Sequence, residues 1–165
     1  MAFSIGNHRL AGQAYVPSPN LGGSLRAKFL VIHYTASGPG FDTAAYFARP
    51  GSKASAHLVI RRDGTLTQCV RFNRIAWHAG RSRWTAADGT RCANLNQHAI
   101  GIELENWGAL QPSADGWLSW SGQEVPGEVL VARHAFGTPD TAWEPFTPAQ
   151  IETAFHDRRR GIVSF

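Results

Sequence analysis

Residues 28–35 read K-F-L-V-I-H-Y-T, a short apolar and partly β-branched run that carries one histidine, His33, close to its end. Such a run is typical of a strand in the interior of a sheet, and it is the strongest strand signal in the chain. Successive side chains of a strand point to opposite faces. We therefore expect Leu30, Ile32 and Tyr34 to share one face and His33 to lie on the other.

A second strand is predicted at residues 99–106, A-I-G-I-E-L-E-N, where Ile100, Ile102 and Leu104 alternate with Gly101 and Glu103. If the apolar side chains of both strands pack beneath helices, His33 and Glu103 emerge together on the opposite face. An imidazole and a carboxylate placed in this way suit a metal-bound water and its general base. The plainer alternative is a hydrogen-bonded structural histidine beside a solvated glutamate. Glu105 has the same parity as Glu103 and is expected at the edge of the cleft or in solvent.

The remaining elements follow from turn and capping signals. The Asp63-Gly64 pair predicts a two-residue hairpin turn between strands at 55–62 and 65–71. Asp42 is expected to cap a short helix at 43–48, and Thr147-Pro148-Ala149-Gln150 a longer one that fades near Gly161. Residues 16–23 read as an irregular loop, and 128–134 as a further strand. Together these elements predict an α/β single domain with a central mixed sheet flanked by helices.

Length and composition narrow the class of protein. A chain of 165 residues, 43% hydrophobic and 17% charged, suffices for one compact core. We expect an irregular N-terminal segment at 1–24 and one domain at 25–165. No apolar run approaches the roughly 18 residues of a membrane span, no secretory signal is visible, and two cysteines exclude a disulfide scaffold.

The net charge of the chain says little about its binding partners. Sixteen Lys and Arg against twelve Asp and Glu leave a net charge of +4, which favours polyanionic partners in general. The one tight basic run, residues 158–160, is interpreted as a solvated helix end, not a nucleic-acid patch. No nucleic-acid partner is therefore expected.

Two further histidines strengthen the functional interpretation. His57 lies on an otherwise apolar strand, and His78 lies in A-W-H-A-G at 76–80. Four polar groups gathered in one cleft, with His33 and Glu103, are more typical of a functional site than of chance.

These segments occur in an order that resembles a known family. F-L-V-I-H-Y-T at 29–35, S-A-H-L-V-I-R-R-D-G at 55–64, A-W-H-A-G at 76–80, L-N at 95–96 and G-I-E-L-E-N at 101–106 resemble the zinc-dependent N-acetylmuramoyl-L-alanine amidases of the second amidase family. These enzymes are relatives of the peptidoglycan recognition proteins. The resemblance extends from about residue 25 to about residue 155. It implies a zinc amidase fold, and peptidoglycan or muropeptide fragments as partners.

The resemblance also implies a reaction and residue roles. The reaction is hydrolysis of the amide between N-acetylmuramic acid and L-alanine by a zinc-activated water. His33 matches the first zinc ligand and Glu103 the residue that takes the proton from that water. Four further residues match family positions near the cleft that bind substrate or support a ligand: His57, Trp77, His78 and Asn96. Trp77 and Trp107 are the tryptophans expected to stack on sugar or peptide.

The C-terminal part departs from the family pattern. The family completes its zinc site with G-H-x-x-I followed by R-K-x-D-P-G, whereas residues 155–165 here read F-H-D-R-R-R-G-I-V-S-F. We expect a truncated or shifted C-terminal part, with neither His134 nor His156 and Asp157 as substitute ligands. Two hypotheses stay open: an amidase, and a non-catalytic peptidoglycan-binding remnant. The expected location is the cytoplasm, or release to the cell wall from a phage-encoded gene.

Overall fold

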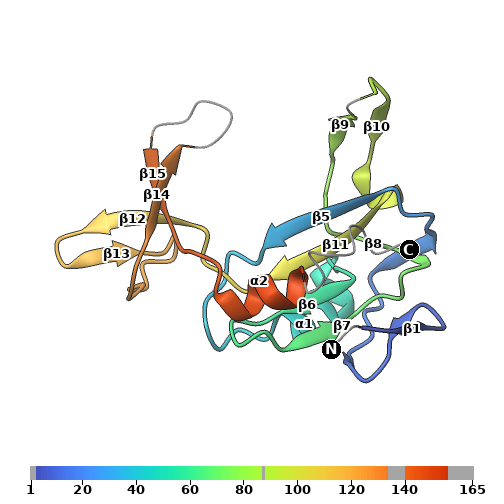
Figure 1. Ribbon diagram of the computed structural model, residues 1–165, viewed down its shortest axis with the longest axis horizontal. Coiled ribbons are helices and arrows are strands. Elements are labelled where there is room, and N and C mark those ends of the chain that lie inside the picture. The colour runs from blue at the N-terminus through green and yellow to red at the C-terminus, as the bar shows by residue number, and fades with distance from the viewer. Residues whose placement is uncertain (1–2, 87, 134–139, 156–165) are drawn as a thin grey trace.

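The computed structural model describes residues 3–86, 88–133 and 140–155 (Figure 1). A central five-stranded sheet has the order β3-β7-β6-β11-β5. β5 and β6 both run parallel to β11, β7 is antiparallel to β6, and β3 is parallel to β7. The predicted mixed sheet is therefore confirmed. Its strands are β3 (Ala14–Tyr15), β5 (Phe29–Tyr34), β6 (Leu58–Ile60), β7 (Leu66–Gln68) and β11 (Ala99–Leu104).

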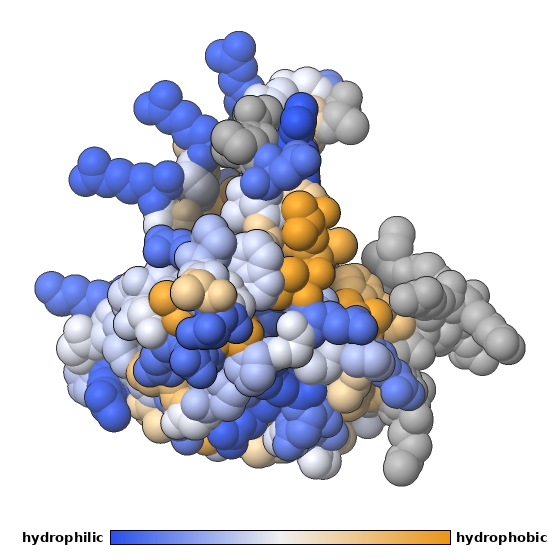
Figure 2. Space-filling view, turned by 90° about the vertical axis from the view of Figure 1, so that its left-hand side faces the viewer, coloured by the Kyte–Doolittle hydropathy of each residue, from blue (hydrophilic) through white to orange (hydrophobic). Residues whose placement is uncertain are grey.

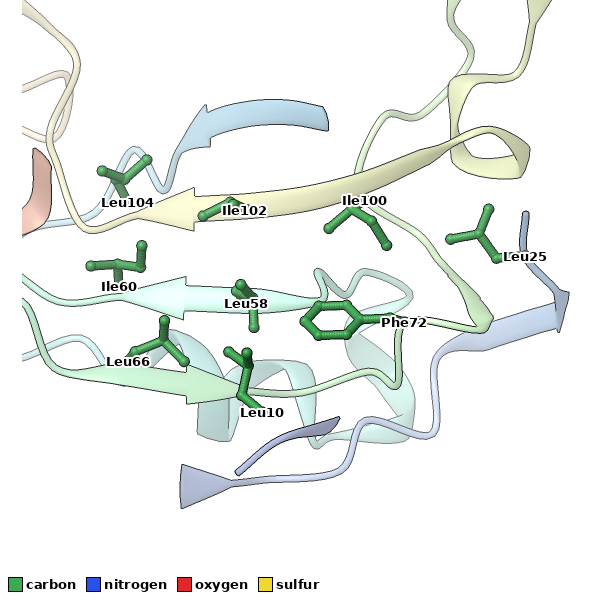
Figure 3. Packing of buried hydrophobic residues seen from close by; sticks show 9 residues of the cluster. All are labelled: Leu10, Leu25, Leu58, Ile60, Leu66, Phe72, Ile100, Ile102 and Leu104. Atoms are coloured by element: carbon green, nitrogen blue, oxygen red, sulfur yellow. The ribbon is translucent and has the colours of Figure 1, made fainter. Parts of the chain in front are cut away.

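One face of this sheet carries the main core. The predicted apolar face of β11 is buried against side chains of β6, β7 and the N-terminal segment (Figure 3). The matching side chains of the edge strand β5 are not covered: Leu30, Ile32 and Tyr34 are 43%, 39% and 43% exposed. The expectation that helices cover both apolar sets is therefore wrong for β5 in the described part of the chain. The core cluster comprises Leu10, Leu25, Leu58, Ile60, Leu66, Phe72, Ile100, Ile102 and Leu104.

The opposite face is covered by the helix α1 (Thr43–Phe47), where the sequence predicts it. Asp42 caps α1, since its Oδ1 accepts a hydrogen bond from the Ala45 N–H at 2.9 Å. Ala44 and Phe47 pack against Val59 of the sheet. A short 3-10 turn, η1 (Pro50–Ser52), follows α1.

The hairpin between β6 and β7 is confirmed, with a different turn. Arg61 N–H donates to the Thr65 carbonyl, which closes a loop of three residues, 62–64, instead of two. Gly64 alone adopts a positive φ, +83°. This is the pattern of a three-residue hairpin loop whose last residue is left-handed.

The N-terminal segment is more regular than predicted. It contains β1 (Ile5–Gly6), β2 (Arg9–Leu10), β3 and β4 (Leu21–Ser24). β3 joins the central sheet beside β7, and β4 pairs with β8 (Arg74–Ala76). Residues 3–24 therefore differ from the irregular segment expected at 1–24, because neighbouring strands supply partners for backbone groups that carry no strong strand signal of their own.

A second, four-stranded antiparallel sheet extends away from the central one (Figure 1). Its order is β13-β12-β15-β14, with bounds Gly116–Leu118, Ala109–Ser113, Asp140–Trp143 and Leu130–Arg133. β14 confirms the strand predicted at 128–134, whereas the other three strands were not predicted. The side of the molecule that carries this sheet is mostly hydrophilic, with small apolar patches (Figure 2). A separate hairpin, β9 (Arg83–Thr85) and β10 (Arg91–Ala93), also projects from the central sheet.

The helix α2 (Pro148–Ala154) begins with the predicted capping box between Thr147 and Gln150. Gln150 is fully buried, and its Nε2 donates to the carbonyls of Ile60 and Glu105 at 3.3 and 2.9 Å. These bonds hold α2 against the ends of β6 and β11. The predicted continuation toward Gly161 lies outside the described residues. Within the described ranges, neither helix has the length and apolar character needed to cross a membrane.

Candidate active site

His33 and Glu103 lie at paired positions on the neighbouring parallel strands β5 and β11. Neighbouring strands are about 4.8 Å apart, and paired residues project to the same face. The two side chains therefore emerge together on the face opposite the main core. The prediction from strand parity is confirmed at this point.

The carboxylate of Glu103 is mostly buried, and it lacks a full set of partners. Its Oε2 atom is buried with no hydrogen-bond partner among the described residues. Burial disfavours the charged form, which raises the pKa of Glu103 to about 8. A carboxyl group with a pKa near neutrality can both accept and donate a proton at physiological pH.

His33 is hydrogen-bonded to His78, whose ring approaches edge-on. The Nε2 atom of His33 lies 2.9 Å from Nδ1 of His78, and the ring centroids are 5.1 Å apart. The other nitrogen of His78, Nε2, faces the Ala99 carbonyl at 3.4 Å. We assign the proton of His78 to Nε2, because a carbonyl can only accept. Nδ1 of His78 then accepts from His33, which leaves on Nδ1 of His33 a lone pair with no hydrogen-bond partner in the described part of the chain.

Burial keeps this pair neutral. Desolvation lowers the pKa of His33, and desolvation together with the neighbouring His33 lowers the pKa of His78 to about 4. Both rings are therefore uncharged at neutral pH, the state in which imidazole acts as a metal ligand or hydrogen-bond acceptor.

Two residues hold His78 over the sheet. A Cβ atom at Gly101 would lie 2.4 Å from the His78 ring, so only glycine leaves room for the imidazole. The Asn96 Oδ1 atom accepts hydrogen bonds from the backbone N–H groups of His78 and Ala79, at 3.0 and 2.7 Å. Asn96, predicted to touch substrate or support a ligand, is thus placed where it supports the backbone of His78.

His57 has a different setting from the one expected of a substrate-binding residue. It is fully buried, its Nδ1 accepts from the Gly101 N–H at 3.0 Å, and its Nε2 donates to the Arg74 carbonyl at 2.9 Å. Desolvation lowers its pKa to about 4. Neither ring nitrogen is free for a ligand, so the geometry gives His57 a structural place beneath Gly101.

The other predicted residues are distributed around this centre. Trp77 is 40% exposed, and its backbone is tied to Ser55 by hydrogen bonds of 2.9 and 3.0 Å. Glu105, expected at the edge of the cleft or in solvent, is buried and does not line the pocket described below. Its carboxylate accepts a hydrogen bond from the Arg62 N–H at 3.3 Å and lies 3.9 Å from Arg61.

The described residues do not complete a metal site. Among them, no group of three or more His, Cys, Asp or Glu side chains could hold a metal ion, whereas catalytic zinc takes three protein ligands. His33 supplies one imidazole. His134, His156 and Asp157, which were not expected to replace the missing ligands, lie outside the described residues.

Glu103 lines a pocket of about 660 Å³. Its walls are the loop that follows β5, the start of α1, and the turn after β13. Trp107, predicted to stack on ligand, also lines the pocket but is only 8% exposed, because it packs in a core cluster with Leu110, Val125 and Ala142. Trp120 and Gln123 also line it, and neither is identified as a site residue from the sequence. The available signal was a tryptophan set among turn-forming residues, W-S-G at 120–122.

The comparisons with known proteins agree with this geometry. A family model described as N-acetylmuramoyl-L-alanine amidase matches residues 23–156. The amidase AmiD of Escherichia coli K12 is 40% identical over 133 residues, which cover 77% of this chain and 37% of AmiD. The 1,6-anhydro-N-acetylmuramyl-L-alanine amidase AmpD of the same strain is 49% identical over 53 residues, 32% of this chain and 26% of AmpD.

The fold comparison points the same way. The crystal structure of a selenomethionine derivative of AmpD superimposes with a TM-score of 0.51 at 32% identity, covering 62% of this chain and 65% of that one. The chain spans only 26% and 37% of the lengths of the curated AmpD and AmiD of Escherichia coli. Since the family model covers residues 23–156 of the 165, the chain belongs to the N-acetylmuramoyl-L-alanine amidase family.

Proposed function

We propose that this chain acts on peptidoglycan fragments and hydrolyses the amide between N-acetylmuramic acid and L-alanine. The observation that carries this proposal is the setting of Glu103. It lies beside His33, lines a pocket of about 660 Å³, and has a buried carboxylate oxygen with no partner among the residues that the structure describes. The membership of the chain in the amidase family supports the choice of bond.

Glu103 is the group that moves the proton in this reaction. Water adds to the lactyl carbonyl carbon and the carbon–nitrogen bond breaks, so one proton must travel from the water to the departing amine. A carboxyl group with a pKa of about 8 can take that proton when ionised and return it when protonated. The same desolvation that raises this pKa strengthens electrostatic interactions with the reacting atoms.

Zinc is the cofactor that the family resemblance implies. His33 would supply one imidazole, but the described residues do not bring two more ligands to it. The fit is therefore incomplete, and the proton transfer above uses only groups of this chain. Zinc content after dialysis, measured by elemental analysis, tests whether the whole chain holds the metal.

The residues around His33 act by positioning. His78 fixes the orientation of the His33 ring through the 2.9 Å hydrogen bond, and Asn96 fixes the backbone that carries His78. Holding a ring in one tautomer and one orientation is the usual contribution of a histidine's partner. We propose this supporting role for His78 and Asn96, and a stacking role against substrate for the exposed Trp77.

Muropeptide hydrolysis tests the function directly. N-acetylmuramoyl-L-alanyl-γ-D-glutamyl-L-lysine is incubated with the protein, and mass spectrometry follows release of the free tripeptide. Glu103→Gln keeps the shape of the side chain and removes the proton-transfer group, so we expect release to fall by at least 100-fold. Glu128→Gln, at an exposed position, serves as the matched control. Equal rates for wild type and Glu103→Gln would refute the role of Glu103.

Binding without hydrolysis is the second candidate function. It is favoured by the absence of a three-ligand metal group among the described residues beside a well-formed pocket. In that case the wild type retains muropeptide in equilibrium dialysis and releases no tripeptide, with or without added zinc. Tripeptide release by the wild type would rule out this candidate.

A further inference from the structure

The turn after β13 holds an exposed tryptophan in a fixed position in the wall of the pocket. Trp120 is 66% exposed, yet its indole Nε1 donates a hydrogen bond to the Ala36 carbonyl at 2.7 Å. Ala36 follows β5 and has a left-handed backbone, with φ of +52°. The bond joins segments 84 residues apart and fixes the plane of the ring.

The turn itself is tightly held. Ser119 is buried, its N–H donates to the Gln123 carbonyl at 2.8 Å, and its hydroxyl accepts from the Gln123 N–H at 3.1 Å. The Gly122 N–H donates to the Ser119 carbonyl at 3.0 Å. Trp120 therefore sits at the tip of a rigid hairpin. A ring held in advance loses little conformational entropy when a ligand stacks on it.

The pocket beneath Trp120 contains unpartnered polar atoms besides that of Glu103. The hydroxyl oxygens of Ser37 and Thr43 are buried with no hydrogen-bond partner among the described residues. Both residues line the pocket, and Thr43 is only 6% exposed. A buried hydroxyl without a partner costs free energy. A ligand that brings its own hydroxyl or amide groups removes that cost.

The charge of the lining discriminates between the two halves of a muropeptide. The described residues that line the pocket include no Lys, Arg or His. Besides the carboxyl group of Glu103, their side chains offer aromatic rings, hydroxyls and one amide. A stem peptide carries carboxylates that would meet no cationic side chain among the described lining residues. The sugar half is uncharged, because its lactyl carboxyl is consumed in the amide. Its C–H faces suit aromatic rings and its hydroxyl and acetamido groups suit the polar atoms.

We infer that the pocket between Trp120 and Thr43 is a subsite for a neutral N-acetylated sugar, with Trp120 as its stacking platform. The assignment rests on the proposed function for its place beside the scissile amide. It adds the direction of the substrate: sugar toward Trp120, stem peptide away from it.

The test measures binding of an uncharged sugar that carries no scissile amide. Di-N-acetylchitobiose is titrated into the full chain and followed by ligand-observed NMR, in parallel with the tripeptide L-alanyl-γ-D-glutamyl-L-lysine. We expect the disaccharide to bind in the millimolar range. Trp120→Ala should weaken it about tenfold. Trp120→Phe keeps a ring and loses the bond to Ala36, so it should weaken binding about threefold.

Thr43→Val removes only the buried hydroxyl and should also weaken disaccharide binding about threefold. Matched controls come from β9, where Trp84→Ala and Thr85→Val alter exposed residues outside the pocket and should leave affinity unchanged. Circular dichroism establishes that each variant is folded.

Three results would overturn the assignment. The disaccharide fails to bind the wild type, Trp120→Ala binds the disaccharide as tightly as the wild type does, or Trp120→Ala loses binding of the tripeptide and keeps binding of the disaccharide. Hydrolysis is scored separately: a chain that binds sugar through Trp120 but releases no tripeptide refutes the amidase proposal and leaves the subsite in place. If the wild type hydrolyses muropeptide and Trp120→Ala binds the sugar as well as the wild type does, the subsite is refuted and the amidase proposal stands.

Discussion

The imidazole of His78 lies directly over Gly101, so closely that a Cβ atom at residue 101 would come within 2.4 Å of the ring. The same ring is hydrogen-bonded to His33 on the neighbouring strand β5, so the position that it takes over Gly101 is the one from which it meets His33. A glycine inside a buried strand, usually a weakness, is here the condition for bringing two histidines together.

The first prediction concerns this glycine. Gly101→Ala should push the His78 ring off β11, break its bond to His33, and lower the free energy of unfolding by about 1–3 kcal/mol. Ring nitrogen chemical shifts of both histidines, measured by NMR, report the loss of the bond. Gly23→Ala, in β4 with open space around its Cβ position, is the matched control. Identical behaviour of the two variants would show that the close contact has no structural consequence.

The second prediction concerns Asn96. Asn96→Ala removes the acceptor of two backbone N–H groups and should slow muropeptide hydrolysis about tenfold, because the segment that carries His78 loosens. Asn96→Asp retains a side-chain oxygen at the same place and should restore most of the rate. The ring shifts of His78 should follow the same order. If Asn96→Asp hydrolyses muropeptide as slowly as Asn96→Ala, the Asn96 side chain does not act by accepting these two hydrogen bonds.

The third prediction follows from the pKa of Glu103. The folded chain has a pKa of about 8 there, against a usual value of 4.5, so it binds more protons than the unfolded chain between these pH values. Stability from this group is therefore lost as pH rises from about 4.5 to about 8. Glu103→Gln cannot ionise and should exceed the wild type in stability at pH 8 by on the order of 1–3 kcal/mol.

Urea unfolding of metal-free protein at pH 5 and pH 8 measures this difference. The gain of Glu103→Gln over wild type should be larger at pH 8, and Glu128→Gln should show no such trend. A gain that is constant with pH would mean that Glu103 ionises normally in the folded chain.

The fourth prediction concerns His57, for which stability changes with pH in the opposite direction. Its pKa falls from 6.5 to about 4 on burial, so the unfolded chain binds the extra proton between these values. Stability therefore rises with pH through that window, by up to about 1.4 kcal/mol per pH unit. His57→Gln should be destabilised at pH 7, because the contacts of the buried ring are lost, and its unfolding free energy should depend less on pH.

Urea unfolding at pH 5.0 and 6.5 checks this, with His98→Gln, at a partly exposed position, as the control. His78 titrates in the same direction and remains in both variants. An unchanged pH dependence in His57→Gln would assign the whole effect to other groups.

The sequence alone predicts the central geometry because it depends on one local rule. The alternation in β5 and β11 separates His33 and Glu103 from the apolar side chains of their own strands, and the parallel register of the two strands then places them side by side. The helix cap at Asp42 and the capping box that begins at Thr147 are equally local features, and both were predicted at the right residues.

The rest depends on long-range contacts that no local pattern encodes. β3 is two residues long and exists because β7 offers it backbone partners. Likewise, the role of Trp120 depends on a carbonyl 84 residues away. The structural place of His57 could not be distinguished from a ligand-binding one, because a histidine on an apolar strand has the same sequence signature in both cases.

The central claim is that this chain breaks the bond between the lactyl carbonyl and the L-alanine nitrogen, with Glu103 moving the proton. The most direct test is mass spectrometry of the products formed in ¹⁸O-labelled water from N-acetylmuramoyl-L-alanyl-γ-D-glutamyl-L-lysine. We expect one ¹⁸O atom in the lactyl carboxylate of the muramic acid product, none in the released tripeptide, and no products with Glu103→Gln. Label in an alanine-containing product, or undiminished turnover by Glu103→Gln, would contradict the claim.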